Sequence, residues 1–250
     1  MLQSISLAER MHQWDEFAEP YSRWVQGCPP NMLDELAALA KDRPALDLGA
    51  GAGRICIPLA RRNIPITAVE LSSRMIERMR EAAAREAVSN LQILQCDFSS
   101  LVAEKRYGLA YCADNAFFAL CSEEEQLRCF RSVASVLESD GFFVVEANAP
   151  ATEVLKAGAR TIRDAPSSAI VERFRSDGGL ALNLITETTA KIAGTLAERS
   201  WTLAHHYVSA SKFDEYASAS KMEMVARWSD WNRAPYDGDP WRHISIWRPA

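Results

Sequence analysis

The stretch Asp47-Leu48-Gly49-Ala50-Gly51-Ala52-Gly53-Arg54 decides the fold of this chain. It follows a short apolar run, 45–48, and leads into a helical pattern. A glycine has no Cβ, so Gly49, Gly51 and Gly53 allow the backbone to turn tightly and to approach a ligand closely. A glycine-rich loop between a strand and a helix, at the carboxyl edge of a parallel sheet, is where α/β folds bind nucleotides.

Short apolar runs alternate with amphipathic helices from this loop outward, as far as Pro150. The apolar runs are 45–48, 66–69, 91–95, 109–113 and 142–147, and the helices are expected at 54–62, 72–88 and 123–138. Parallel strands need crossover connections, so this alternation predicts an α/β fold with a mostly parallel sheet and helices on both of its faces.

The pattern changes after Pro150. Runs rich in Val, Ile and Thr, separated by turns such as Gly178-Gly179, indicate an inserted antiparallel β-meander. The expected elements are a short helix at 151–159, strands at 169–175, 180–191 and 196–209, a helix at 211–220, and final strands at 223–228 and 243–247. No linker or repeat divides the chain, so we expect one domain with segments 1–40, 41–150, 151–210 and 211–250.

The N-terminal segment has apolar residues at helical spacing over 8–25, which predicts an amphipathic helix interrupted at Pro20. The run Cys28-Pro29-Pro30 then breaks the helical pattern. Asn31 can cap a second helix over 32–40.

The composition excludes several classes of protein. The 250 residues carry a net charge of −5, so there is no overall basic field to hold a phosphate backbone, and we expect no nucleic-acid partner. No apolar run approaches the ~18–20 residues that span a bilayer, and the N-terminus lacks a signal-peptide core. The six cysteines are dispersed, without a C-x-x-C pair. We therefore expect a cytoplasmic protein with reduced thiols and no membrane partner.

Two further acids sharpen the prediction of the ligand. Glu70 ends the second apolar run, where a carboxylate can accept both hydroxyls of a ribose, and Asp97 follows the third, where it can accept an adenine amino proton. A dinucleotide fingerprint would need a glycine in place of Arg54. Asp47 would repel a pyrophosphate, whereas it suits the ammonium group of an amino acid. The pattern thus favours an adenosyl amino acid over a dinucleotide.

Four motifs carry a resemblance to a known family. They are D-L-G-A-G-A-G at 47–53, V-E-L-S at 69–72, C-D-F at 96–98 and C-A-D-N at 112–115. With these motifs, residues 20–150 resemble the class I S-adenosylmethionine-dependent methyltransferases. The resemblance implies a Rossmann-like fold with a mostly parallel seven-stranded sheet, S-adenosyl-L-methionine as the cofactor, and an N-terminal segment, 1–40, that acts as a helical lid.

The resemblance also implies which residues hold the cofactor. The methionine part would lie at Asp47 and the glycine loop, the ribose at Glu70, the adenine at 96–98, and the sulfonium beside Cys112-Ala113. The full set of cofactor residues that it implies is Tyr21, Asp47, Gly49, Ala50, Gly51, Gly53, Glu70, Leu71, Cys96, Asp97, Phe98, Cys112 and Ala113. The order of elements, the meander and Tyr21 are similar to bacterial small-molecule and peptide N-methyltransferases of biosynthetic pathways.

Methyl transfer is an in-line displacement, for which the protein supplies mainly alignment and a dry cavity. An amine acceptor must be neutral to attack, so a modest base or a low-dielectric pocket suffices. The candidate catalytic residues are His206, His205 and Asp114, and replacing the correct histidine should lower turnover without altering cofactor affinity. Asp114 either contacts the acceptor or caps the next short helix. The candidate acceptor-pocket residues are Trp24, Asn115, Glu146, Asn148 and Tyr207.

The predicted function is methyl transfer to an amine of a small metabolite or short peptide. The alternatives are a natural-product O-methyltransferase, which would need a general base, and a catalytically silent cofactor-binding module. The sequence 114–117 lacks the two prolines of nucleobase amino-methyltransferases, which argues against DNA or tRNA bases. Four histidines without ligand spacing predict no metal. The strands of the meander would either pair edge to edge in a homodimer or cover the acceptor site.

Overall fold

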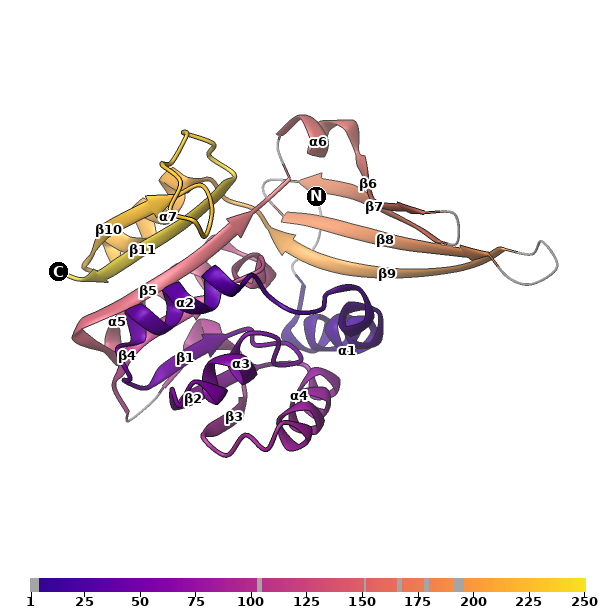
Figure 1. The fold of residues 1–250 in the computed structure, drawn as a ribbon. Helices are drawn as coiled ribbons and strands as arrows, with labels where there is room; N and C mark the ends of the chain where they lie inside the picture. The colour runs from indigo at the N-terminus through magenta and orange to yellow at the C-terminus, as the bar shows by residue number, and fades with distance from the viewer. Residues whose placement is uncertain (1–4, 103–104, 151, 166–167, 178–179, 191–195) are drawn as a thin grey trace.

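The computed structural model describes residues 5–102, 105–150, 152–165, 168–177, 180–190 and 196–250 (Figure 1). Seven strands form the main sheet, namely β1 (Ala45–Leu48), β2 (Ile66–Glu70), β3 (Leu91–Gln95), β4 (Tyr107–Cys112), β5 (Leu137–Asn148), β10 (Met222–Trp228) and β11 (Arg242–Pro249). Their order is β10-β11-β5-β4-β1-β2-β3. β1 to β5 pair in parallel, and β11 is antiparallel to both β5 and β10. The sheet is therefore mostly parallel, as predicted.

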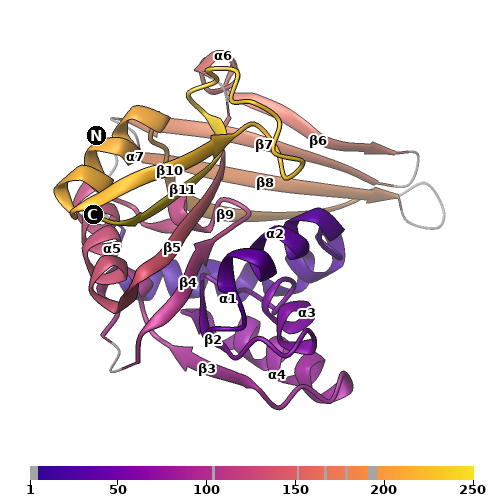
Figure 2. The same cartoon turned by 60° about the vertical axis from the view of Figure 1, so that its left-hand side comes forward.

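Helices cover both faces of the main sheet (Figures 1 and 2). The helices are α2 (Pro30–Ala40), α3 (Cys56–Arg61) and α4 (Ser73–Arg85) on one face, and α5 (Glu123–Val136) and α7 (Ala210–Ala219) on the other. Strand residues alternate between the faces, so Leu109 and Tyr111 pack toward α2–α4 while Ala110 and Cys112 pack toward α5 and α7. This arrangement confirms the predicted Rossmann-like α/β class.

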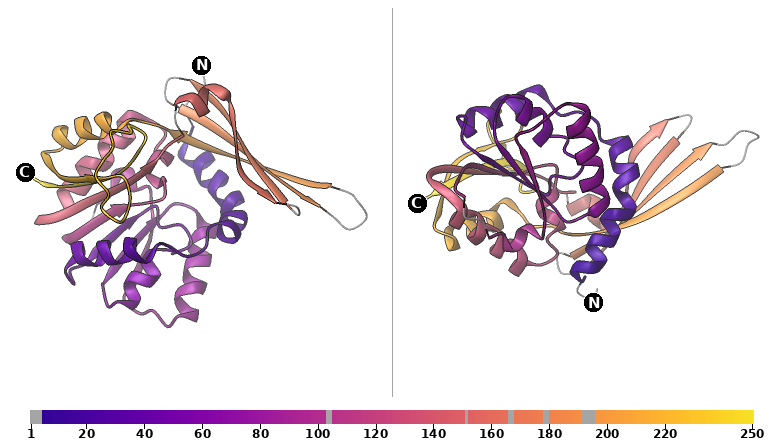
Figure 3. Two further views of the ribbon diagram at one scale, coloured as in Figure 1. Left: turned by 45° about the horizontal axis from the view of Figure 1, so that its top comes forward. Right: turned by 90° about the horizontal axis from the view of Figure 1, so that it is seen from below.

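A second sheet of four antiparallel strands extends away from the main sheet (Figure 3). We call it the small sheet, and it consists of β6 (Ala159–Ala165), β7 (Ser168–Asp177), β8 (Leu180–Ala190) and β9 (Leu196–His206), preceded by the short helix α6 (Thr152–Ala157). It is the predicted antiparallel meander, with one strand more than expected. β6 escaped the prediction because charged residues interrupt its apolar pattern, and an edge strand tolerates such charges.

Helix α1 (Leu7–Trp24) runs along the carboxyl edge of the main sheet, between that edge and the small sheet (Figures 1 and 3). It begins with a capping box, in which the Ser6 hydroxyl accepts from Glu9 N (3.2 Å) and the Glu9 carboxylate accepts from Ser6 N (2.8 Å). The predicted interruption at Pro20 is wrong. The ring of Pro20 is buried with Phe17 and Ala18, and this packing offsets the one backbone hydrogen bond that a proline cannot donate.

Two other expected boundaries are also wrong. Asn31 does not cap α2, because the helix already begins at Pro30, whose fixed φ suits a first helical position. The Asn31 amide instead donates to Asn232 Oδ1 (2.7 Å). β5 begins at Leu137 rather than Phe142, because its first residues are polar and carry no alternation signal.

Among the residues described above, no helix is both long and apolar enough to cross a membrane.

Candidate active site

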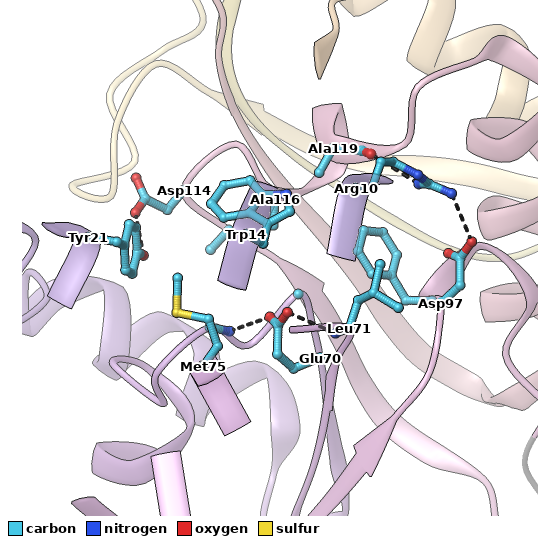
Figure 4. A pocket seen from close by; sticks show the side chains of 14 residues that line it. Arg10, Trp14, Tyr21, Glu70, Leu71, Met75, Asp97, Asp114, Ala116 and Ala119 are labelled. Atoms are coloured by element: carbon cyan, nitrogen blue, oxygen red, sulfur yellow. Dashed lines mark hydrogen bonds and ion pairs between the residues drawn. The ribbon is translucent and has the colours of Figure 1, made fainter. Parts of the chain in front are cut away.

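A pocket lies where the carboxyl ends of β1, β2 and β4 meet helix α1 (Figure 4). It is lined by Arg10, Trp14, Tyr21, Gly49, Gly51, Glu70, Leu71, Met75, Asp97, Phe98, Ala113, Asp114, Ala116 and Ala119. Eight of these were predicted as cofactor residues, and Asp114 was predicted as catalytic. Three carboxylates reach the pocket: Glu70 at the end of β2, Asp97 in the turn after β3 and Asp114 in the turn after β4. They meet because the carboxyl ends of parallel strands lie at the same edge of a sheet.

The glycine loop forms the floor of this pocket. Gly49 has a φ of +74°, and a Cβ at that position would lie 2.7 Å from the Cβ of Ala116, so only glycine fits this close approach. Gly53 does not line the pocket. A Cβ there would lie 2.6 Å from Ile57 and 2.8 Å from Met79, so this glycine serves the packing of the loop against α3 and α4.

Glu70 ties the end of β2 to the glycine loop. Its Oε2 accepts from Gly51 N (2.8 Å), and its Oε1 accepts from Leu71 N and Ser72 N (2.8 Å each). Burial raises the pKa of the Glu70 carboxyl, while these three backbone donors oppose that rise because they favour the charged form. The carboxylate is thus held in one orientation at the wall of the pocket.

Asp97 meets a residue that the sequence did not single out. Its Oδ1 accepts from Ser99 N (2.8 Å), and its Oδ2 accepts from Arg10 Nη2 (3.2 Å). The same nitrogen of Arg10 donates to Glu125 Oε1 (2.8 Å), and Arg10 Nη1 donates to the Ala119 carbonyl (3.1 Å). Arg10 is a buried guanidinium that joins α1 to the turns after β3 and β4.

Asp114 sits at the mouth of the pocket, just after β4. Its Oδ2 accepts from the Tyr21 hydroxyl (3.1 Å) and from Arg54 Nη2 (2.9 Å), and no described residue donates to its Oδ1. Burial raises the pKa of Tyr21, and the charge of Asp114 adds to that rise, so the phenol stays a donor. Asp114 does not cap the next short helix, because Asn115 occupies the N-cap position there and makes no side-chain cap bond.

Asp47 is buried beneath the glycine loop and does not line the pocket. Its strand partner across the sheet is Tyr111, and no described residue hydrogen-bonds its Oδ2. Burial, the largest cause, raises the pKa of Asp47 to about 7. The predicted contact with an ammonium group therefore concerns a carboxyl that gains or loses its proton near neutral pH.

The raised pKa predicts that the ligand-free protein loses stability as the pH rises. Between its ordinary pKa of 3.8 and about 7, Asp47 is ionised in the unfolded chain but protonated in the folded one. From about pH 5 to about pH 8 this group should lower the free energy of unfolding by about 3 kcal/mol, with no further loss above the folded pKa. Urea denaturation of wild type and Asp47→Asn at both pH values isolates the effect. An equal pH dependence in both proteins would contradict it.

The remaining predicted cofactor residues lie outside the pocket lining. Ala50 is buried in the loop, Cys96 is partly buried after β3, and Cys112 is fully buried in the core against α5 and α7. Alternation along β4 explains why Ala113 reaches the pocket while the side chain of its neighbour Cys112 does not.

The two histidines predicted as general bases also lie outside the pocket lining. His205 Nδ1 meets Asn183 Nδ2 (3.0 Å), its ring packs edge-on against Trp14, and burial lowers its pKa to about 4. His206 faces the other side of β9, and its backbone carbonyl accepts from Gln126 Nε2 (2.8 Å). The side-chain hydroxyl of Tyr207 accepts from Asn183 (2.7 Å). At these positions neither His205 nor His206 lines the pocket, so the predicted role as a general base has no support from a contact there.

The predicted acceptor residues divide between two places. Glu146 and Asn148 line a second hollow at the end of β5, together with Trp231 and Arg242. Glu146 Oε2 accepts from Asp114 N (2.9 Å), which places this hollow directly beside the mouth of the pocket. Asn115 bridges to the backbone of Asn148 through both its amide groups (3.0 and 2.7 Å). Trp24 instead faces the small sheet, where its indole donates to Glu187 Oε1 (3.1 Å).

Sequence reasoning missed Arg10, Trp14, Met75, Ala116 and Ala119. Arg10 and Trp14 are four residues apart, and Tyr21 follows seven residues later, so the three share one face of α1. This spacing relative to Tyr21 could have pointed to Arg10 and Trp14 as residues of the site. In the described part of the chain, no group of three or more His, Cys, Asp and Glu residues is placed to hold a metal ion.

The fold and the position of the pocket resemble those of the class I S-adenosylmethionine-dependent methyltransferases, and comparisons with known proteins agree with this resemblance. Residues 45–141 match the family described as a methyltransferase domain. The CcbJ methyltransferase from Streptomyces caelestis is similar over 96% of this chain and 99% of its own, with a TM-score of 0.85 and 28% identity. The SAM-bound structure of CalS10, an amino pentose methyltransferase from Micromonospora echinaspora, is similar over 100% of this chain and 99% of its own, with a TM-score of 0.68 and 16% identity. Residues 45–141 thus match a methyltransferase domain, and the chain shares its fold with known methyltransferases.

A curated relative points to another kind of substrate. The tRNA 5-carboxymethoxyuridine methyltransferase of Escherichia coli (strain K12) is 32% identical over 95 residues. The match covers 33% of this chain and 36% of the relative, so the chain spans about a third of the length of that protein. The name of this relative does not fit our expectation that no nucleic acid is a partner, and we do not retain that exclusion.

Proposed function

We propose that the protein transfers a methyl group from S-adenosylmethionine to an amine of a small molecule or short peptide. The observation that carries this proposal is the position of Asp114, a carboxylate at the mouth of the pocket with one oxygen facing no described donor. An amine nitrogen carries N–H groups that such an oxygen can accept, which orients the nitrogen without a strong base.

The chemistry of the pocket suits the proposed cofactor. Among the described residues, Glu70, Asp97 and Asp114 supply carboxylates to the lining, Arg10 pairs with Asp97, and Arg54 pairs with Asp114. The balance of these groups stays negative and favours a ligand with net positive charge. Leu71 and Phe98 add apolar side chains to the lining near Asp97, and the flat adenine base of the cofactor could pack between them. When bound, S-adenosylmethionine supplies a sulfonium whose methyl group is already activated for displacement.

The residues of this chain then have separable roles. Glu70 would hold a ribose, Asp97 would accept from an adenine amino group, and Tyr21 with Arg54 would fix the orientation of Asp114. In the transfer, the new nitrogen–carbon bond would replace the carbon–sulfur bond of the sulfonium, the sulfur would leave as a neutral thioether, and the positive charge would pass to the acceptor nitrogen. The carboxylate of Asp114 would stabilise that charge until a proton leaves to water.

The amine proposal draws further support from what the pocket lining contains. A hydroxyl acceptor needs a base that removes its proton, and neither His205 nor His206 lines the pocket. The similarity to an amino pentose methyltransferase agrees with an amine acceptor, whereas the match to a tRNA enzyme is confined to 33% of the chain. The hollow at Glu146 and Asn148 would receive the part of the acceptor that does not react.

The test is a panel of acceptors incubated with the protein and S-adenosylmethionine. Amino sugars, peptides with a free N-terminus, phenols and unmodified tRNA would be compared by mass spectrometry for the gain of one or two methyl groups. Methylation of nitrogen in an amino sugar or peptide supports the proposal. Methylation confined to a phenol oxygen or to tRNA overturns it and assigns the acceptor class directly.

A further inference from the structure

Helix α1 contacts both the pocket and the small sheet. Arg10, Trp14 and Tyr21 line the pocket (Figure 4). Next to them on the helix surface, the Gln13 amide oxygen accepts from Ala204 N of β9 (3.1 Å), and Phe17 packs among apolar side chains of the small sheet. The helix is therefore held between the pocket and the small sheet.

Polar contacts on the pocket side bind α1 to the main sheet. Arg10 donates to Asp97 and Glu125, as described above, and Tyr21 donates to Asp114. Asp15 Oδ1 accepts from the Ser72 hydroxyl (2.6 Å) and from Arg74 N (3.1 Å) at the start of α4. Every one of these contacts has to break if α1 is to move away from the pocket.

Glu187 of β8 is the centre of the polar contacts between α1 and the small sheet. Its Oε2 accepts from Arg23 Nη2 (2.7 Å), and its Oε1 accepts from Trp24 Nε1 (3.1 Å). Only 5% of the Glu187 surface is exposed, so both carboxylate oxygens are buried against the last turn of α1. The rings of Trp24 and Trp201 meet edge-on beside it, with centroids 5.4 Å apart.

We propose that Glu187 is a positioning residue that holds α1 closed over the pocket through the small sheet, so that this sheet sets how long the cofactor stays bound. Withdrawing α1 would break both hydrogen bonds to Glu187, one of them also an ion pair, and would expose the apolar side chains of Phe17 and Trp24 and those of the small sheet to water. The sheet thus resists opening although none of its described residues lines the pocket. The inference rests on the part of the proposed function that places the cofactor beneath α1.

The chain offers a matched control for Glu187. Glu172 of β7 lies on the same face of the small sheet and is 4% exposed, and its carboxylate accepts from Arg160 Nε of β6 (2.7 Å). This pair lies within the small sheet and does not involve α1. Glu172→Gln should therefore weaken the sheet as Glu187→Gln does, without releasing the helix.

The experiment measures the dissociation of S-adenosylhomocysteine by stopped-flow fluorescence, for which Trp14 in the pocket lining is a reporter. Glu187→Gln should dissociate the ligand about tenfold faster than wild type, because a hydrogen-bonded buried charge is lost, and Glu172→Gln should stay within about twofold. Trp24→Phe removes the indole donor but keeps an aromatic ring, so it should also speed dissociation. It serves as the second test if Glu187→Gln does not fold.

Hydrogen exchange of the ligand-free protein gives a readout that needs no cofactor. Backbone amides of α1 should exchange faster in Glu187→Gln than in Glu172→Gln, whereas a general weakening would affect both equally. The inference would be overturned if Glu187→Gln and Trp24→Phe left the rates of ligand dissociation and amide exchange unchanged. It would also be overturned if Glu172→Gln raised these rates as much as Glu187→Gln does. Since no acceptor is used, a failure to methylate any amine leaves this result interpretable. If wild type bound no S-adenosylhomocysteine, the proposed function would fail and the exchange data would still test the role of Glu187.

Discussion

Glu70→Gln should weaken the binding of S-adenosylhomocysteine by about 100-fold, because it removes a buried carboxylate that several donors share. The two oxygens of Glu70 accept from the backbone of Gly51 on one side and of Leu71 and Ser72 on the other. A glutamine has one oxygen and one NH₂ group, so in either orientation an NH₂ group faces a backbone N–H. The loop would then lose its alignment with the end of β2, and a ribose would lose its acceptor.

Isothermal titration calorimetry of the two proteins measures the change in affinity. Glu138→Gln is a suitable control, because Glu138 stands at the opposite edge of the main sheet and pairs with Arg43 (2.8 Å). Its affinity for the ligand should equal that of wild type. If Glu70→Gln remained folded and bound the ligand within about threefold of wild type, Glu70 would have no part in holding the cofactor.

Asp114→Asn should lower turnover about 100-fold while leaving the affinity for S-adenosylhomocysteine within about twofold of wild type. The backbone of Asp114 has a φ of +52°, a conformation that asparagine adopts as readily, so the substitution introduces no strain. The amide oxygen can still accept from Tyr21 and Arg54, which turns the NH₂ group toward the incoming amine. Two N–H groups would then face each other, and the charge that stabilises the product cation is absent.

Steady-state kinetics with the amine found in the acceptor panel would measure this effect. The matched control is Asp140→Asn, an exposed aspartate that pairs with Arg43 (2.6 Å) far from the pocket, and its turnover should be unchanged. A turnover of Asp114→Asn within about threefold of wild type would show that acceptor orientation does not depend on this carboxylate.

The strand ends of the main sheet could be predicted from the sequence because their signals are local. The glycine loop and Glu70 occur at fixed distances from apolar runs, and the chain connectivity of a parallel sheet brings these positions to one edge. The same reasoning put Asp97 and Asp114 at the ends of the next strands, and both residues line the pocket. It did not show that Asp47 would be buried, since the burial of a side chain depends on what packs above it.

The contributions of α1 and the small sheet could not be predicted in the same way. Alternation along β9 indicates that His205 and His206 face opposite sides, but the packing of α1 decides which of those sides is covered. From the sequence alone, Arg10 looks like an exposed charged residue of an amphipathic helix, and only the structure reveals its partners Asp97 and Glu125. These contacts join residues about a hundred positions apart, and no local pattern records them.

By itself the sequence determined the class of fold, the glycine loop, and the carboxylates at the ends of the strands, because each follows from short-range periodicity and chain connectivity. Only the tertiary structure decided that Asp47 is buried, that Arg10 meets Asp97, and that Arg23 and Trp24 of α1 meet Glu187. Those outcomes depend on how separate elements pack, because the energetic effect of a buried charge depends on the partner that tertiary packing brings next to it.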